Sequence, residues 1–243
     1  MMVSNTAYQN QLLQMDVNEF AYFLMNEIEK EKLLILDFRY ISAEIEAWWS
    51  SENKELPVFM LKAKINYIFM KKLNREHLGF FDKVGLAKNY IAGICVRNIF
   101  TTDSPKLALV VHESLSELFH LSDIQYEYEE HKTLFLKKQA VEYKDWGSGY
   151  GEITPHSDDL YEGLNVDYLS LTTCRDETST PTRCFFPKHI LRDFTKEELF
   201  RLYFLKANFK SGKNVKKHIQ RQRNILSYCT KYGFRFFLDF RID

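Results

Sequence analysis

The spacing of the apolar residues changes near Asn89, and this change constrains the fold more than any other feature of the sequence. Before it, segments such as NEFAYFLMNEIEKEK and PVFMLKAKINYIFMKKLNREH repeat apolar side chains at helical spacing. After it, YIAGICVRNIF has the apolar density of a buried strand. We therefore predict an α+β fold, in which a helical region at 1–88 packs on a strand-rich domain at 89–243.

The second part of the chain alternates between helical and strand patterns. KLALVVHESLSELFHL and TKEELFRLYFLKAN predict helices, the latter with Thr195 as the N-cap and Glu198 at the third position. The segments predicted as strands are IQYEYEEHKTLFLKKQAVEY (two strands), VDYLSLTTCR, RCFFP and FRFFLDFRID. In VDYLSLTTCR, period-2 alternation puts Ser170 and Thr172 on one face of the strand.

Composition excludes several classes of protein. The 243 residues are 45% hydrophobic and carry 33 basic and 33 acidic side chains, so net charge points to no particular partner. No apolar run approaches the roughly 20 residues that cross a bilayer, and the first residues lack a secretory pattern. The sparse cysteines, none in a C-x-x-C pair, are typical of reduced thiols, and we expect a cytoplasmic protein. They are Cys95, Cys174, Cys184 and Cys229.

His156 and Asp158 form the strongest candidate metal pair. An imidazole and a carboxylate two residues apart reach one ion from the same side of an extended strand. Taken alone, an H-x-D triplet is more often a solvated loop pair than a metal site. Here it is followed by the strand pattern VDYLSLTTCRD.

The ordered set NYIAGICVRNIF, IQYEYEEHKTLFLKKQAVEY and GEITPHSDDLYEGLNVDYLSLTTCRDETSTPTRCFF resembles a known family. It is similar to the clavaminate-synthase-like iron(II)/2-oxoglutarate dioxygenases of the TauD/TfdA superfamily, a group that includes hydroxylases of free amino acids. The resemblance implies a double-stranded β-helix (jelly-roll) core. It also implies a cytoplasmic oxidoreductase that decarboxylates 2-oxoglutarate and abstracts hydrogen from a C–H bond through a ferryl species.

The same resemblance assigns roles to individual residues. His156 and Asp158 would be the first two ligands of Fe(II), and Asp159 would replace Asp158 only if the register slips by one residue. Thr182 would contact the 2-oxoglutarate co-substrate. Ser148 and Asp239 would contact a small-molecule substrate such as an amino acid. Thr182 and Ser148 are more typical of ordinary turn residues than of ligand contacts.

The family pattern places a distal histidine and an arginine after the strand that FRFFLDFRID resembles. Only two histidines follow Asp158: His189, which we expect to be a surface or packing residue, and His218, whose surrounding cations oppose a metal ion. By this pattern the chain lacks the third ligand, the arginine and the strands that close the jelly roll. Exposed sheet edges would then favour self-association.

Three alternatives account for that lack: a piece of a longer enzyme, a chain completed by a partner, and a catalytically inactive relative that binds a ligand or a partner. Besides an oxygenase and an inactive relative, the basic run from Lys206 to Arg223 suggests a third class of function, a binder of nucleic acid or of another acidic surface. Its single aromatic residue, Phe209, disfavours stacking on single strands, so nucleic acid is not the expected partner. Phosphate loops, nucleophile elbows and zinc-finger spacings are absent from the sequence.

Overall fold

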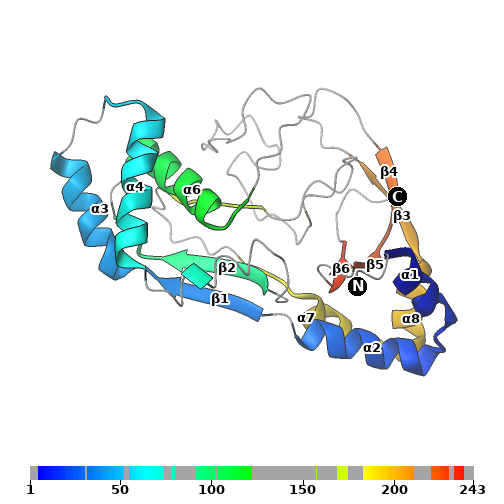
Figure 1. Cartoon of the computed structure of the whole chain (residues 1–243). Helices are drawn as coiled ribbons and strands as arrows, with labels where there is room; N and C mark the ends of the chain where they lie inside the picture. Colours follow the sequence, from blue (N-terminus) through cyan, green and yellow to red (C-terminus); the bar gives the residue numbers. More distant parts are fainter. Residues whose placement is uncertain are drawn as a thin grey trace.

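The computed structural model describes residues 5–30, 32–51, 55–73, 78–79, 91–101, 103–121, 157, 169–174, 183–210, 220–229 and 233–237. The elements in these ranges are α1 (Asn5–Gln14), α2 (Val17–Glu29), β1 (Lys32–Asp37), α3 (Arg39–Ser51), α4 (Val58–Lys72), β2 (Ile91–Arg97), α6 (Pro105–Leu118), α7 (Pro187–Leu191), α8 (Lys196–Phe204), β3 (Lys206–Lys210), β4 (Gln220–Asn224), β5 (Leu226–Cys229) and β6 (Gly233–Phe236). The strands pair as three two-stranded sheets (Figure 1).

The first sheet pairs β1 with β2 in parallel, and helices cover one of its faces. The register joins Leu34 to Ile94 and Leu36 to Val96. Leu36, Ile94 and Val96 pack against a buried cluster formed by α3, α4 and α6, while Ile35 of β1 stays 50% exposed. The parallel pair therefore buries one apolar face, as expected when helices connect parallel strands.

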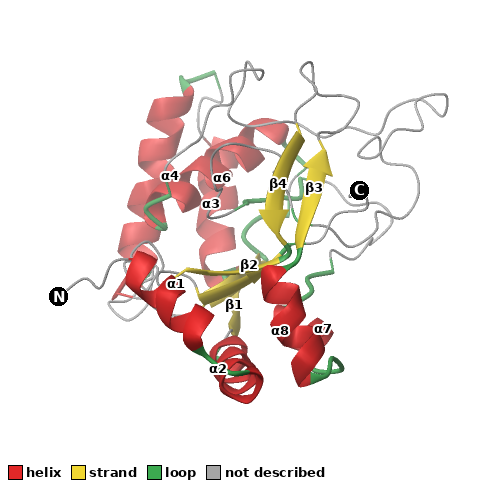
Figure 2. Ribbon diagram, turned by 90° about the vertical axis from the view of Figure 1, so that its right-hand side faces the viewer, coloured by secondary structure: helices red, strands yellow, loops and turns green. Residues whose placement is uncertain are grey.

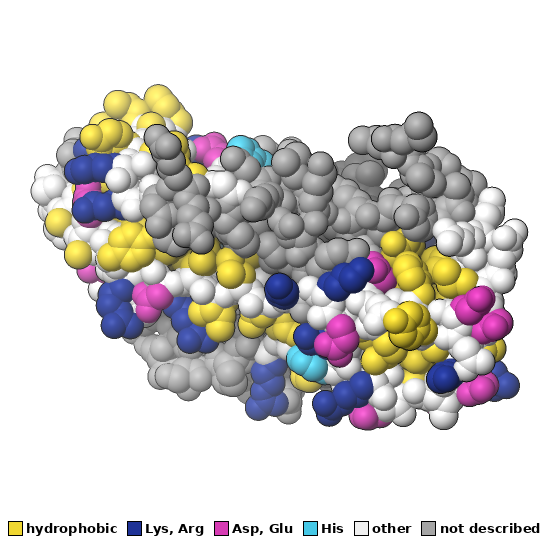
Figure 3. Space-filling model, turned by 60° about the horizontal axis from the view of Figure 1, so that its bottom comes forward, with side chains coloured by type: hydrophobic (Ala, Val, Ile, Leu, Met, Phe, Trp, Pro, Cys, Tyr) yellow, Lys and Arg dark blue, Asp and Glu magenta, His cyan; other side chains and the backbone are white. Residues whose placement is uncertain are grey.

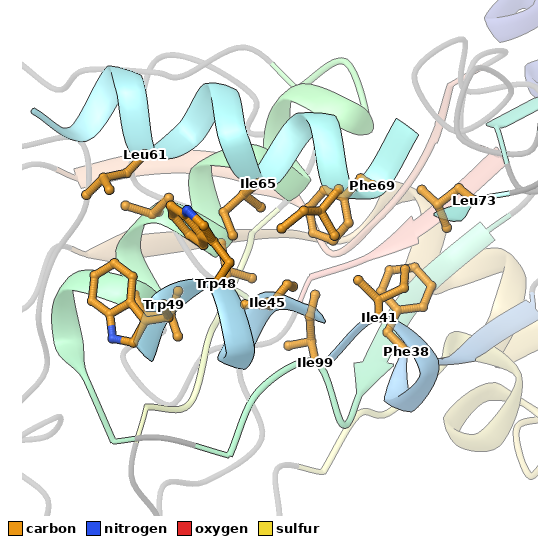
Figure 4. Close-up of a cluster of buried hydrophobic side chains, with 14 of the residues drawn as sticks. Phe38, Ile41, Ile45, Trp48, Trp49, Leu61, Ile65, Phe69, Leu73 and Ile99 are labelled. Carbon is orange, nitrogen blue, oxygen red and sulfur yellow. The ribbon is translucent and has the colours of Figure 1, made fainter. Parts of the chain in front are cut away.

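Helices α3 and α4 form the centre of this cluster. Leu61, Ile65 and Phe69 recur along one side of α4 and point toward Ile41 and Ile45 of α3 (Figure 4). All five side chains are fully buried. Spacings of three and four residues place these side chains along one side of each helix. The apolar residues that predicted α4 are therefore the ones that pack in the core.

A second cluster joins the N-terminal helices to the C-terminal elements. Phe20 of α2 is fully buried. The centre of its ring lies 5.5 Å from the ring centre of Phe200 and 5.1 Å from that of Tyr203, both on α8, and 6.0 Å from that of Phe234 on β6. Leu24 and Ile28 lie on the same face of α2 and belong to this cluster. Phe20 is 180 residues from Phe200 and 214 residues from Phe234 in the sequence, and these distant segments share one core.

Capping residues fix where α2 and α8 begin. The Asp16 side chain accepts hydrogen bonds from the backbone N–H groups of Asn18 and Glu19, at 2.7 and 2.9 Å, and Glu19 reaches back to the N–H of Asp16. Thr195 and Glu198 form the same reciprocal arrangement at α8, which confirms the cap predicted from the sequence.

Several predicted boundaries differ from the structure. The strand β1 was not predicted, because its short apolar run KLLILD lies between two strong helical patterns. The helix predicted over TKEELFRLYFLKAN ends at Phe204, and Lys206–Lys210 forms β3 instead. Pairing with β4 explains this change, since it buries Ala207 and Phe209 at alternating positions.

The strand predictions have mixed outcomes. YIAGICVRNIF contains β2 and FRFFLDFRID begins within β6, so these two predictions hold over the described residues. Residues 169–174 and 183–186, from VDYLSLTTCR and RCFFP, are irregular rather than strands, since neither segment pairs in a sheet. Residues 124–143, predicted as two strands, lie outside the described residues, and the jelly roll stays a prediction.

Candidate functional site

Ser157 stands between the two predicted iron ligands, and it contacts the last described strand. Its Oγ donates a hydrogen bond to the carbonyl oxygen of Phe236 at 3.4 Å, across 79 positions in the sequence. Phe236 is the final residue of β6 and belongs to the segment FRFFLDFRID. The contact places Ser157 beside the end of β6.

The backbone around Phe236 is held by its neighbours. The N–H of Phe237 donates to the carbonyl of Ile225 at 2.8 Å, and the guanidinium of Arg223 lies 5.9 Å from the centre of the Phe237 ring. Such a cation–ring contact is attractive, because the ring face is electronegative. The acceptor of the Ser157 hydrogen bond is therefore fixed by β4, β5 and β6 together.

A second contact ties the segment Leu169–Cys174 to helix α6. His112 Nδ1 lies 2.8 Å from Thr172 Oγ1 and 3.5 Å from Ser170 Oγ. Both hydroxyls reach the same imidazole, so the alternation predicted for Ser170 and Thr172 holds although the segment is not paired in a sheet. Leu169 and Leu171, on the other side, are 58% and 65% exposed.

The thiol of Cys174 ends this segment. Burial raises the pKa of Cys174, and the nearby carboxylate of Asp103 raises this pKa further. Only the thiolate is a good metal ligand or nucleophile. This direction of the pKa shift favours the neutral thiol of Cys174.

A polar cluster that the sequence analysis missed lies at the carboxyl ends of β1 and β2. Asp37 Oδ1 accepts from the backbone N–H of Arg39 at 2.9 Å, and Asp37 Oδ2 accepts from Asn98 Nδ2 at 3.0 Å and Arg39 Nη2 at 3.3 Å. Asn98 has φ of 57°, a left-handed conformation that asparagine tolerates. The signal that could have found it is the apolar run Leu33–Leu36 ending directly in an aspartate.

This cluster opens on a surface depression of about 410 Å³ lined by Asp37, Arg39 and Tyr40. The carboxyl ends of parallel strands are common places for ligands. Here, however, the Asp37 carboxylate already accepts hydrogen bonds from Arg39 and Asn98. The bond from the backbone N–H of Arg39 lies at the start of α3. Its geometry serves the β1–α3 junction.

The Asp37 contacts predict a pH dependence of stability. The Arg39 N–H and then the Asn98 amide hold the pKa of Asp37 below its ordinary value. A lowered folded-state pKa stabilises the fold at pH above the unfolded-state value of about 4, and this contribution is lost as pH falls through the folded-state pKa. We expect Asp37→Asn to reduce the loss of thermal stability on acidification, measured by circular dichroism melts from neutral pH downward. Asn98→Ala should reduce the loss of thermal stability on acidification in part. If both variants lose as much thermal stability at low pH as the wild type, Asp37 does not cause the pH dependence.

The residues predicted to bind iron, 2-oxoglutarate and substrate lie outside the described residues. They are His156, Asp158, Asp159, Thr182, Ser148 and Asp239, and His218 lies outside them as well. His189 is described: it is exposed on α7 and its ring lies 5.6 Å from that of Phe186, edge to face. Within the described ranges, no three His, Cys, Asp or Glu side chains gather as a metal site would require.

Comparison with known proteins leaves the family assignment as a prediction. A scan against protein-family models, a search of curated proteins and a search of solved structures find no match. In the part of the chain that the structure describes, no helix has the length and apolar character needed to cross a membrane.

Proposed function

We propose that the chain is an iron(II)/2-oxoglutarate-dependent oxygenase that hydroxylates a free amino acid or a similar small molecule. The observation that carries this proposal is the hydrogen bond from Ser157 Oγ to the Phe236 carbonyl. It brings Ser157, the middle residue of the triplet His156-Ser157-Asp158, to the segment FRFFLDFRID, which resembles the strand that precedes the distal histidine in the family. The order of motifs in the sequence supports the same proposal.

The donor chemistry of the triplet fits ferrous iron. An imidazole nitrogen and a carboxylate oxygen, from His156 and Asp158, are two members of the facial set of two histidines and one carboxylate used by non-haem iron oxygenases. Bound iron, together with 2-oxoglutarate and O2, supplies the oxidation of an unactivated C–H bond. In an extended segment, residues 156 and 158 share a face opposite that of residue 157.

The proposal assigns the remaining polar residues to binding. Thr182 would donate a hydrogen bond from its hydroxyl to 2-oxoglutarate. Ser148 and Asp239 would orient an amino-acid substrate, whose ammonium group would pair with the carboxylate of Asp239. The alternative is a catalytically inactive relative that binds a ligand or a partner. The two differ in one property, which is turnover of the co-substrate.

Succinate release from 2-oxoglutarate tests the proposal. We expect the purified chain to release succinate in the presence of Fe(II), ascorbate and O2, and to release more when a pool of free amino acids contains the substrate. His156→Ala should abolish this release, whereas His189→Ala should retain it, because His189 is exposed and packs on Phe186. Absence of release from the wild-type chain favours the inactive alternative, and release that survives His156→Ala contradicts the assignment of His156 as an iron ligand.

A further inference from the structure

The strands β3 and β4 form an antiparallel hairpin with two unlike faces. Their register pairs Ala207 with Arg223 and Phe209 with Arg221 on one face. On the other face, the paired residues are Lys206 with Asn224, Asn208 with Gln222, and Lys210 with Gln220. Figure 2 shows the two strands side by side. All six residues of this second set, which we call the outer face, are polar, and none is acidic.

The inner face anchors the hairpin to the rest of the molecule. Ala207 and Phe209 are buried, at 7% and 0% exposure, and Ile225 and Phe237 pack against them. The guanidinium of Arg223 lies over the ring of Phe237. Because these contacts hold the inner face, the outer face is presented on a fixed support.

Three of the six outer-face residues are exposed to solvent. Lys206, Gln220 and Gln222 are exposed, and Asn208 and Lys210 are half-buried. Asn224 is engaged at the base of the hairpin, where its Nδ2 donates to the Tyr203 carbonyl at 3.0 Å. The face thus carries two lysines and four amide side chains along two strands of roughly 17 Å.

Charge is distributed unevenly between this region and the rest of the chain. Residues 206–223 contain seven Lys and Arg and no Asp or Glu, although the whole chain has 33 of each sign. By contrast, basic and acidic side chains of the described residues are interspersed on the face drawn in Figure 3. A run of one sign repels itself and creates a local positive potential that attracts an anionic partner.

The geometry selects among anionic partners. The outer face has no apolar side chain to insert into a bilayer and no aromatic ring on which an unpaired base could stack. A two-stranded ribbon fits the major groove of B-form DNA, whereas the major groove of duplex RNA is too narrow. Lysines bind phosphates, and Asn and Gln amides hydrogen-bond to phosphates or base edges.

From these observations we propose that the outer face of the β3–β4 hairpin binds duplex DNA, chiefly through its phosphates. The sequence raised a binder of nucleic acid on the basic run from Lys206 to Arg223 but disfavoured it, because the run was predicted to be helical through Asn208 and has a single aromatic residue for stacking on single strands. This inference does not rest on the proposed oxygenase activity.

Fluorescence anisotropy with a labelled mixed-sequence duplex of about 20 base pairs tests this proposal, between about 50 and 200 mM salt. The double variant Lys206→Gln/Lys210→Gln removes two outer-face cations. The matched control, Lys32→Gln/Lys64→Gln, removes two exposed lysines from β1 and α4 and changes the net charge equally. We expect the wild-type affinity to fall with salt. The hairpin variant should bind about tenfold more weakly, with a salt slope smaller by about 2, and the control should match the wild type.

Four results would overturn the proposal: no binding by the wild-type chain at low salt, equal losses in the two double variants, tighter binding of the single strand than of the duplex, or binding to phosphatidylserine vesicles without binding to the duplex. Thermal melts of both variants should match the wild type, because neither changes a buried side chain. Loss of DNA binding by the hairpin variant with an unchanged melt supports the outer face as the contact surface.

Discussion

Phe20→Ala should lower the free energy of unfolding by about 3–5 kcal/mol, the range for truncating a buried phenylalanine. Phe20 is fully buried, and its ring contacts Phe200, Tyr203 and Phe234. Truncation removes apolar area from the core and leaves a cavity that three large rings cannot close without moving their own backbones. Such a loss is a large part of the stability of an ordinary domain.

Urea denaturation followed by circular dichroism measures this effect. The matched control is Tyr22→Ala on the same helix, since Tyr22 is 74% exposed and should change stability by no more than about 0.5 kcal/mol. The Phe20 site joins α2 to α8 and β6, so the variant should also lose protection of amide hydrogens in α8. Equal midpoints for the two variants would mean that the second cluster is not packed as described.

His156→Ala and Asp158→Ala should each weaken Fe(II) binding by on the order of 100-fold or more, because changes in residues that merely support metal ligands already cost up to about that factor. Loss of a ligand leaves the ion with fewer donors and admits water. Asp159→Asn is the matched control: it removes a neighbouring carboxylate that would lie on the opposite face of an extended segment. Anaerobic calorimetric titration of Fe(II) in the presence of 2-oxoglutarate measures all three affinities.

The comparison between Asp158 and Asp159 also tests the register. If Asp159→Asn abolishes binding and Asp158→Ala leaves it intact, the segment is shifted by one residue and His156 pairs with the other carboxylate. If no variant changes the affinity, the triplet is a solvated loop and the proposed metal site is wrong.

Local signals in this sequence predicted local structure. Helices α2, α4 and α6 follow the spacing of their apolar residues, and Thr195 with Glu198 marks the start of α8, because caps and helical stripes depend on residues three or four positions apart. The missed features depend on distant residues. β1 exists because β2, some 60 residues later, pairs with it, and the chain leaves α8 for β3 because β4 buries Phe209 against it.

The same distinction applies to the candidate site. The H-S-D spacing and the following strand pattern are visible in the sequence, and they predict which side chains would hold a metal. The hydrogen bond from Ser157 to Phe236 spans 79 positions, so no local sequence pattern predicts it. The two-faced hairpin is a similar case, since its outer face exists only once the register of β3 and β4 is known.

An anaerobic titration of Fe(II) into the chain with 2-oxoglutarate tests the central claim most directly. Chelation of iron by 2-oxoglutarate in a protein site gives a visible metal-to-ligand charge-transfer band, which requires both the metal and the co-substrate to be bound. The account predicts a saturable band in the wild-type chain and in His189→Ala, and none in His156→Ala. A wild-type chain that gives no band, or a band that persists in His156→Ala, would contradict it.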